Sequence, residues 1–118
     1  MNALVLKNHG IDSVSGLNRC LGDEDMYTCI LGMFLEDDSY DRLKAAYLNN
    51  DLQAQFKCAH ELKGACGNAS LTELYETVSK LVEYLRGGGS DAAAINEMFA
   101  SVTTSYLRAR EGIALVLS

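Results

Sequence analysis

The chain contains no proline among its 118 residues. Because proline interrupts helices and central strands, its absence favours long uninterrupted helices. No apolar run approaches the roughly 18 residues that a membrane span needs. The start of the chain, MNALVLKNHG, is too short and too weakly apolar for a secretory signal. These absences predict a cytoplasmic protein that neither spans nor binds a membrane.

Positive charge is also scarce. The chain has 10 Lys and Arg against 16 Asp and Glu, which gives a net charge of −6. Nucleic-acid backbones are bound by basic surfaces, so this balance argues against a nucleic-acid partner. The length and the 48% of hydrophobic residues predict one folded domain over residues 1–118.

The four cysteines include no CxxC pair, so the usual zinc signature is missing. Without an export signal disulfides are not expected, and we predict buried or half-buried thiols that pack like small hydrophobic residues. A metal site formed by Cys58, His60 and Cys66 is excluded, because Cys58 points roughly 160° from His60 on a regular helix. No metal site is therefore predicted.

Apolar residues at helical spacing predict five segments. Polar N-cap residues precede them, and glycine, asparagine or loop residues end them. The segments are Asp12 to Gly22, Asp23 to Asn50 with a bend or interruption in EDDSYD at 36–41, Asp51 to Asn68, Ser70 to the break at Gly87–Gly89, and Ser90 or Asp91 onward. Ser70 and Glu73 match a capping box, and the final GIALVLS either continues the last helix or frays.

Each long segment carries one apolar stripe and one polar face, and no alternating strand pattern competes. Such helices bury their stripes against one another. We predict an all-α fold, an antiparallel four-helix bundle with a short additional N-terminal helix. The predicted core includes Met26, Ile30, Met33, Phe34, Leu52, Phe56, Ala59, Leu62, Cys66, Leu71, Leu74, Val78, Leu81, Leu85, Ile95, Met98, Phe99, Val102, Tyr106 and Ala109.

The stretch HELKGACG, residues 60–67, departs from this pattern because it places two glycines inside a helix. Each costs about 1 kcal/mol relative to alanine. On a helical wheel, Lys63, Gly64 and Gly67 lie near His60, and His60 lies roughly 100° or more from the centre of the core stripe. The result is a patch with one imidazole, one ammonium and two gaps in the side-chain cover.

This patch suits phosphoryl acceptance at a protein interface. A neutral imidazole is nucleophilic, an ammonium attracts a phosphoryl group, and glycines let a partner approach closely. No nucleotide-binding loop, kinase signature or dense acidic metal cluster is present, so the donor must come from another protein. Two alternatives stay open: His60 as an ordinary surface histidine, and the glycines as the site of a close helix crossing.

The stretch AHELKGACGNASL, residues 59–71, resembles the phosphoacceptor motif of histidine phosphotransfer (Hpt) domains, which runs roughly A-H-x-L-K-G-x-A-x-x-x-G. Residues 10–37 are similar to the opening helices of that family, so the resemblance covers most of the chain. The sequence departs from the family pattern at Cys66, at Gly67 and at Ser70, where the family often has glycine.

The resemblance implies a four-helix bundle that carries phosphate between receiver domains. It implies that His60 is the phosphoacceptor, that Lys63 contacts the phosphoryl group and that Gly64 opens space for the receiver; Gly67 joins the expected docking surface. The expected partners are response-regulator receiver domains and a hybrid sensor histidine kinase. The receiver would supply an aspartate and Mg²⁺, so no intrinsic cofactor, no autonomous enzyme activity and a monomer are expected.

Two other functions are compatible with the sequence. One is a helical protein-interaction module without covalent chemistry. The other is the N-terminal phosphotransfer domain of a larger signalling kinase. The start at Met1 and the lack of a linker favour a free-standing protein.

Overall fold

The computed structural model describes all 118 residues, and it contains helices and short connections but no strand. The all-α prediction is therefore confirmed. The seven helices are α1 (Ala3–Asn8), α2 (Ser13–Arg19), α3 (Glu24–Glu36), α4 (Ser39–Leu48), α5 (Leu52–Ala69), α6 (Thr72–Arg86) and α7 (Ala92–Leu117).

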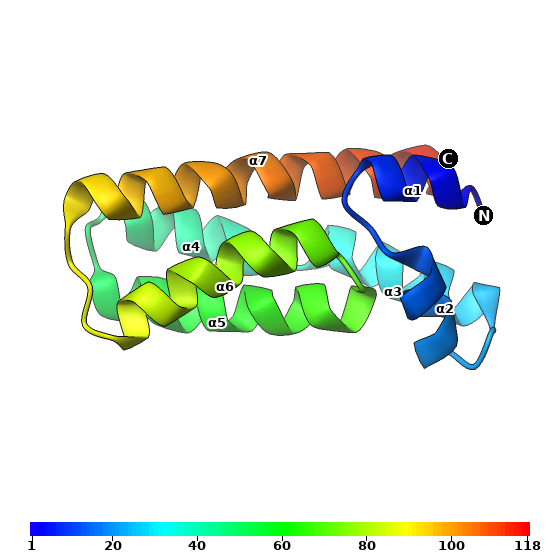
Figure 1. Cartoon of the computed structure of the whole chain (residues 1–118), viewed down its shortest axis with the longest axis horizontal. Coiled ribbons are helices and arrows are strands. Elements are labelled where there is room, and N and C mark those ends of the chain that lie inside the picture. The colour runs from blue at the N-terminus through cyan, green and yellow to red at the C-terminus, as the bar shows by residue number, and fades with distance from the viewer.

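The helices form an elongated bundle of 42 × 21 × 20 Å, with α7 running along most of its length (Figure 1). Helices α5 and α6 form a hairpin; α5 also packs against α4 and α3, and α7 packs against α6, α3 and α1. The short helices α1 and α2 lie at the end where α7 terminates (Figure 1). None of the seven helices combines the length and the apolar character that crossing a membrane requires.

Three aspartates begin helices as the sequence predicted. The carboxylates of Asp12, Asp23 and Asp51 each accept a hydrogen bond from the backbone N–H three residues later, at 3.1, 3.1 and 3.0 Å. Each bond satisfies one N–H group that has no partner within the helix. These caps fix where α2, α3 and α5 begin.

The predicted interruption at 36–41 is confirmed as the break between α3 and α4. Asp37 leaves the helical conformation, with φ −72° and ψ 131°. Its carboxylate accepts a hydrogen bond of 2.8 Å from the N–H of Ser39, the first residue of α4, whose N-cap is Asp38. The Asp37 side chain competes with a helical backbone carbonyl for the same donor, the Ser39 N–H. This competition explains why an aspartate ends α3 here.

The turn between α5 and α6 corrects two predictions. Helix α5 continues past Asn68 to Ala69, and Ser70, with φ 56° and ψ 40°, is the left-handed residue that ends it. The predicted capping box at Ser70 is wrong: the N-cap of α6 is Leu71, and no side chain caps it. Ser70 cannot serve as N-cap because its left-handed backbone belongs to the end of α5.

Two short helices precede α3, whereas the sequence predicted only one. The unpredicted helix, α1, begins where the Asn2 side chain accepts a hydrogen bond from the Val5 N–H at 3.1 Å. Its Leu6 is fully buried, and α1 lies against α7. At the other terminus, the segment GIALVLS continues α7 as far as Leu117.

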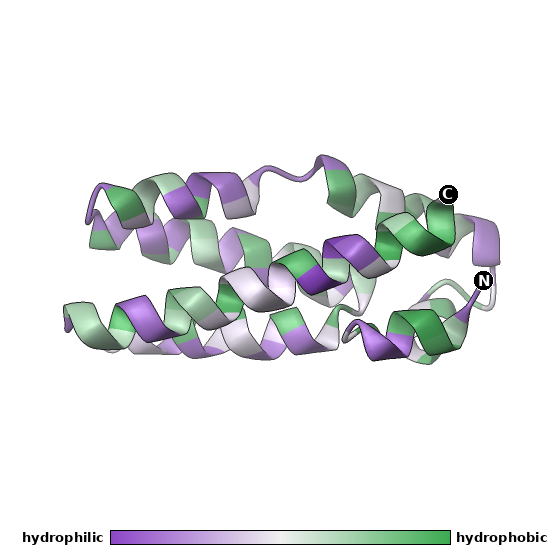
Figure 2. Cartoon of the chain, turned by 90° about the horizontal axis from the view of Figure 1, so that it is seen from above, coloured by the Kyte–Doolittle hydropathy of each residue, from purple (hydrophilic) through white to green (hydrophobic).

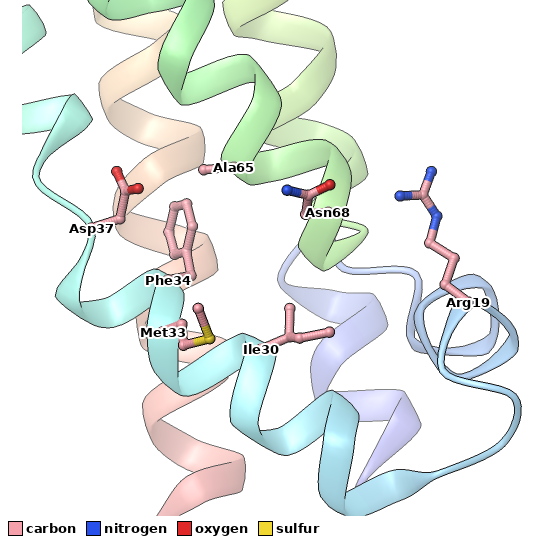
Figure 3. A pocket seen from close by; sticks show the side chains of 7 residues that line it. All are labelled: Arg19, Ile30, Met33, Phe34, Asp37, Ala65 and Asn68. Carbon is pink, nitrogen blue, oxygen red and sulfur yellow. The ribbon is translucent and has the colours of Figure 1, made fainter.

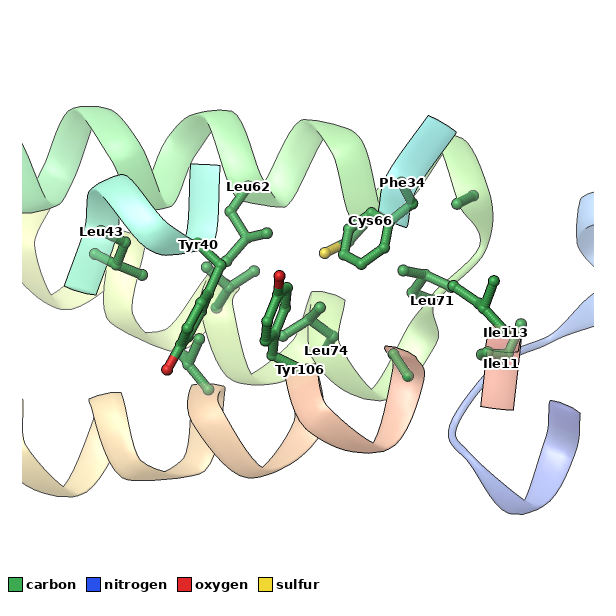
Figure 4. Close-up of a cluster of buried hydrophobic side chains, with 14 of the residues drawn as sticks. Ile11, Phe34, Tyr40, Leu43, Leu62, Cys66, Leu71, Leu74, Tyr106 and Ile113 are labelled. Atoms are coloured by element: carbon green, nitrogen blue, oxygen red, sulfur yellow. The ribbon is translucent and has the colours of Figure 1, made fainter. Parts of the chain in front are cut away.

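Aromatic rings fill the core between α4 and α7. The rings of Tyr40 and Tyr106 stack with centroids 4.0 Å apart, and those of Tyr47 and Phe99 stack at 4.1 Å. Figure 4 shows Tyr40 beside Tyr106, and Phe34 beside Cys66 further along the same core. These rings and the aliphatic residues of α5 and α6 form one continuous core.

The predicted core stripe is correct on α6 and α7 but partly wrong on α3 and α5. Met26 and Met33 are 51% and 66% exposed, and Leu52 is 38% exposed. The buried positions of α3 are Phe34, as predicted, and Tyr27 and Leu31, which were not in the predicted stripe. Helix α3 has apolar residues around much of its circumference, so periodicity alone could not choose the buried face. Figure 2 shows hydrophobic and hydrophilic residues alternating around the long helices.

Candidate functional site

The centre of the site is His60, in the middle of α5 and exposed to solvent. Its neighbours Ala59 and Leu62 are both 0% exposed. These two residues fix the rotation of α5 about its axis, because a helix turns by about 100° per residue. Burying them leaves the imidazole on the outer face.

One side of the imidazole is flanked by an aromatic ring. Phe56, one turn before His60, has its ring centroid 6.2 Å from that of the imidazole, at an angle of 32°. The Arg86 guanidinium of α6 lies 5.6 Å from the centroid of the Phe56 ring on which it rests. Both separations suit attractive contacts of aromatic rings. These contacts form a column of three side chains, Arg86, Phe56 and His60, which links α6 to the exposed imidazole.

The charged neighbours of His60 are held on opposite sides. The Glu61 carboxylate pairs with Arg42 of α4, which also pairs with Asp38. The Lys63 ammonium lies on the α6 side, 5.5 Å from the centroid of the Tyr75 ring. The negative side chain next to His60 is therefore neutralised by an arginine, whereas the positive one contacts only a neutral ring.

The two glycines of the motif have different surroundings. Gly64 is open: a side chain added there would meet nothing within 4 Å. Gly67 is covered within the molecule, since an added Cβ would lie 3.4 Å from Cε2 of Tyr75. In addition, Arg19 of α2 donates a hydrogen bond of 2.6 Å to the Gly67 carbonyl oxygen. The structure thus brings His60, Lys63 and Gly64 to one accessible surface and places Gly67 under Tyr75.

The cysteines do not form a site with His60. Cys58 and Cys66 are 7% and 0% exposed, on the core side of α5. Burial, and secondarily the nearby Asp37 carboxylate, raises the pKa of the Cys66 thiol above its usual range. Nowhere do three or more His, Cys, Asp or Glu side chains come together in a way that would hold a metal ion. Cys20 is also buried, but Cys29 is exposed, so the prediction of buried or half-buried thiols is wrong for Cys29.

A groove of about 540 Å³ lies between α3 and the second half of α5, beside the His60 face. It is lined by Arg19, Ile30, Met33, Phe34, Asp37, Ala65 and Asn68. Figure 3 shows Ile30 and Met33 on α3 across from Ala65 and Asn68 on α5, with Arg19 at one end. The sequence analysis missed this groove because it assigned Ile30 and Met33 to the core. The one sequence feature that could have revealed the groove is that α3 carries apolar residues on two faces, of which only one can be buried.

The comparisons with known proteins agree with this geometry. The family model of the Hpt domain matches residues 30–111, which include the second half of α3, all of α4, α5 and α6, and most of α7. Comparisons with curated proteins and with solved structures gave no match. The match spans more than half of the chain and includes the whole helix that carries His60. The chain therefore belongs to the Hpt domain family, whose members carry phosphoryl groups on histidine in two-component phosphorelays.

Proposed function

We propose that the chain is a phosphohistidine carrier with His60 as its phosphoacceptor. The chain has two histidines, and His60 is the one that lies within the residues matched by the family. His9 lies outside them, with its Nδ1 2.7 Å from the Val5 carbonyl oxygen and its side chain against Gly112. An exposed imidazole inside the matched region is the observation that carries the proposal.

In the proposed reaction, a nitrogen of the neutral imidazole attacks the phosphorus of an aspartyl phosphate on a receiver domain. The N–P bond forms, the P–O bond to the aspartate breaks, and the aspartate leaves as a carboxylate. The other ring nitrogen gives its proton to solvent, and the reverse sequence passes the phosphoryl group to a second receiver. Mg²⁺ bound by the receiver would neutralise charge on the moving group.

This chain would contribute a nucleophile, a cation and a docking surface. The Lys63 ammonium would approach the phosphoryl oxygens, and the open surface at Gly64 would admit the receiver's active-site loops. Most of the rate enhancement would come from positioning and electrostatics shared across the interface. The chain would accordingly have no enzyme activity on its own and would need no intrinsic cofactor.

The groove between α3 and α5 extends the proposed docking surface. It adjoins the His60 face, and Met33 on its rim is 66% exposed although apolar. Exposed apolar side chains grouped on one face are typical of interaction sites. We further propose that residues 1–118 act as one monomeric domain. The competing function, a helical interaction module, would use the same groove without any covalent chemistry.

The test is transfer of labelled phosphate from a phosphorylated receiver domain. We expect the label on the parent protein to be lost in acid, as a phosphoramidate is, and we expect mapping to place it on His60. His60→Gln should accept no label, whereas the matched control His9→Gln should be labelled like the parent. Transfer to His60→Gln, or acid-stable label, would contradict the proposal and favour the interaction module.

A further inference from the structure

The side chain of Lys63 is held by an aromatic ring. Its Nζ lies 5.5 Å from the centroid of the Tyr75 ring, within the distance of about 6 Å at which a cation is attracted to a ring face. Lys63 takes part in none of the ion pairs of the molecule. Tyr75 belongs to α6, so this contact joins the two helices of the α5–α6 hairpin beside His60.

Gly67 provides the place where the Tyr75 ring lies. A Cβ at position 67 would be 3.4 Å from Cε2 and 3.7 Å from Cδ2 of the ring. That space suffices for a methyl group, but a longer side chain would displace the ring. The ring therefore requires a small residue at 67, but it does not require glycine rather than alanine.

The neutral ring restrains Lys63 without neutralising it. A lysine side chain has many rotamers, and confining it to one region costs conformational entropy. A carboxylate partner would confine the ammonium but would also compete with a phosphoryl group for it and repel that group. A tyrosine ring confines the ammonium and leaves its full positive charge available.

We propose that Tyr75 is a positioning residue for Lys63. Its ring, lying on Gly67, confines the ammonium of Lys63, which follows His60 by about one helical turn, to the α6 side of the surface that also carries Gly64. The ammonium is then already confined to one side of α5 when a phosphoryl group arrives on the imidazole. This inference rests on the proposed function of His60.

The structural part of the test is an NMR measurement. A cation above a ring face is shielded by the ring current, so the Lys63 ε-methylene protons should resonate upfield of their random-coil position. Tyr75→Phe retains the ring and should retain this shift, whereas Tyr75→Leu should abolish it. Because Tyr75 is 40% exposed, both variants should melt close to the parent temperature. An unchanged Lys63 signal in Tyr75→Leu would overturn the inference.

The functional part is a double-mutant cycle on the rate of phosphoryl transfer. Tyr75→Leu should slow the rate at saturating receiver by about two- to five-fold, the size expected for an exposed cation–ring contact, without changing the receiver concentration at half-maximal rate. Tyr75→Phe should transfer at the parent rate. In a Lys63→Ala background, Tyr75→Leu should cause no further loss, because its effect acts through the lysine.

Two outcomes of the cycle separate the inference from the function on which it rests. If His60 is phosphorylated but Tyr75→Leu is as fast as the parent, or slows transfer equally with and without Lys63, the role of Tyr75 is overturned and the carrier function stands. If the parent protein takes no phosphate on His60, the carrier function fails, and the proposed role for the ammonium fails with it.

Discussion

His60 owes its accessibility to the two residues buried beside it on α5. Ala59 and Leu62 are both 0% exposed, so the helix cannot turn the imidazole inward without exposing them. Phe56 flanks the ring, and the carboxylate of Glu61 is paired with Arg42. The fold therefore presents an exposed imidazole whose neighbour in sequence, the Glu61 carboxylate, is neutralised by an arginine. Under the proposed function, a partner would bring the activated phosphoryl group.

The first prediction at the residue scale concerns Gly64, because a substitution there can impair docking without impairing folding. A side chain there meets nothing within 4 Å, so Gly64→Ala should raise the free energy of unfolding by up to about 1 kcal/mol through helix propensity. Gly64→Gln should also fold normally but should block transfer, because its side chain would fill the space beside the imidazole. Thermal melting and the transfer assay measure the two effects separately.

Gly16 is the matched control for this prediction. A Cβ at Gly16 would lie 2.3 Å from the ring of Tyr27, which is 0% exposed and donates a hydrogen bond of 2.8 Å to the Ala69 carbonyl oxygen. Gly16→Ala should therefore lower the melting temperature, in contrast to Gly64→Ala. If Gly64→Gln melts as far below the parent as Gly16→Ala does, Gly64 serves packing, and its proposed docking role is wrong.

At the scale of elements, the α5–α6 hairpin contains a strained residue at its turn. Ser70 has φ 56°, a left-handed conformation that costs a residue with a side chain roughly 1–2 kcal/mol and that glycine adopts freely. Ser70→Gly should therefore stabilise the protein by about 1 kcal/mol and leave phosphoryl transfer unchanged. Chemical denaturation measures the difference. The control is Ser101→Gly inside α7, which should destabilise the protein by a similar amount.

A decrease in stability for Ser70→Gly would mean that the serine side chain, 6% exposed, makes a contact worth more than the backbone strain. The left-handed turn also gives a physical reason for the glycine that Hpt sequences often have at this position. From the sequence, Ser70 was assigned to a capping box instead, because a serine followed three residues later by Glu73 matches that motif. A serine between two helices can equally end the first helix or start the second. Only the backbone angles distinguish a residue that ends one helix from a residue that starts the next.

The same elements show which features a single sequence could reveal. The orientation of α5 was predictable around His60, because Ala59, Leu62 and Cys66 mark one apolar side. The buried side of α3 was not, since Met26 and Met33 are as apolar as the buried Leu31. His60, Lys63 and Gly64 lie on one helix and could be grouped by spacing alone. The contacts of Lys63 with Tyr75, of Phe56 with Arg86 and of Glu61 with Arg42 involve other helices. Helical spacing carries no information about such distant pairs.

At the scale of the whole molecule, the bundle has a surface where His60 lies beside exposed apolar side chains. The groove between α3 and α5 lies beside the His60 face, and Met33 on its rim is 66% exposed. The helices α1 and α2 are at the same end of the bundle, where Arg19 of α2 lines the groove and holds the Gly67 carbonyl. We expect a receiver docked over His60 to contact this groove as well.

The last prediction tests that surface with two substitutions to aspartate at equally exposed apolar positions, one at the groove and one away from it. Met33 and Leu48 are both 66% exposed, but Leu48 is at the end of α4, away from the groove. Met33→Asp and Leu48→Asp should both leave the melting temperature nearly unchanged, because neither side chain is in the core. If a receiver covers the groove, Met33→Asp forces a carboxylate into an apolar contact, and burying an unpaired polar group costs about 1–3 kcal/mol.

Met33→Asp should therefore raise the receiver concentration needed for half-maximal transfer by roughly ten-fold or more, the equivalent of about 1.4 kcal/mol or more. The rate at saturating receiver should change little, since His60 and Lys63 are untouched. Leu48→Asp should match the parent in both quantities. Equal effects of the two substitutions would mean that added negative charge on this acidic protein weakens docking from a distance. The groove would then have no special part in binding, and the receiver would contact the His60 face alone.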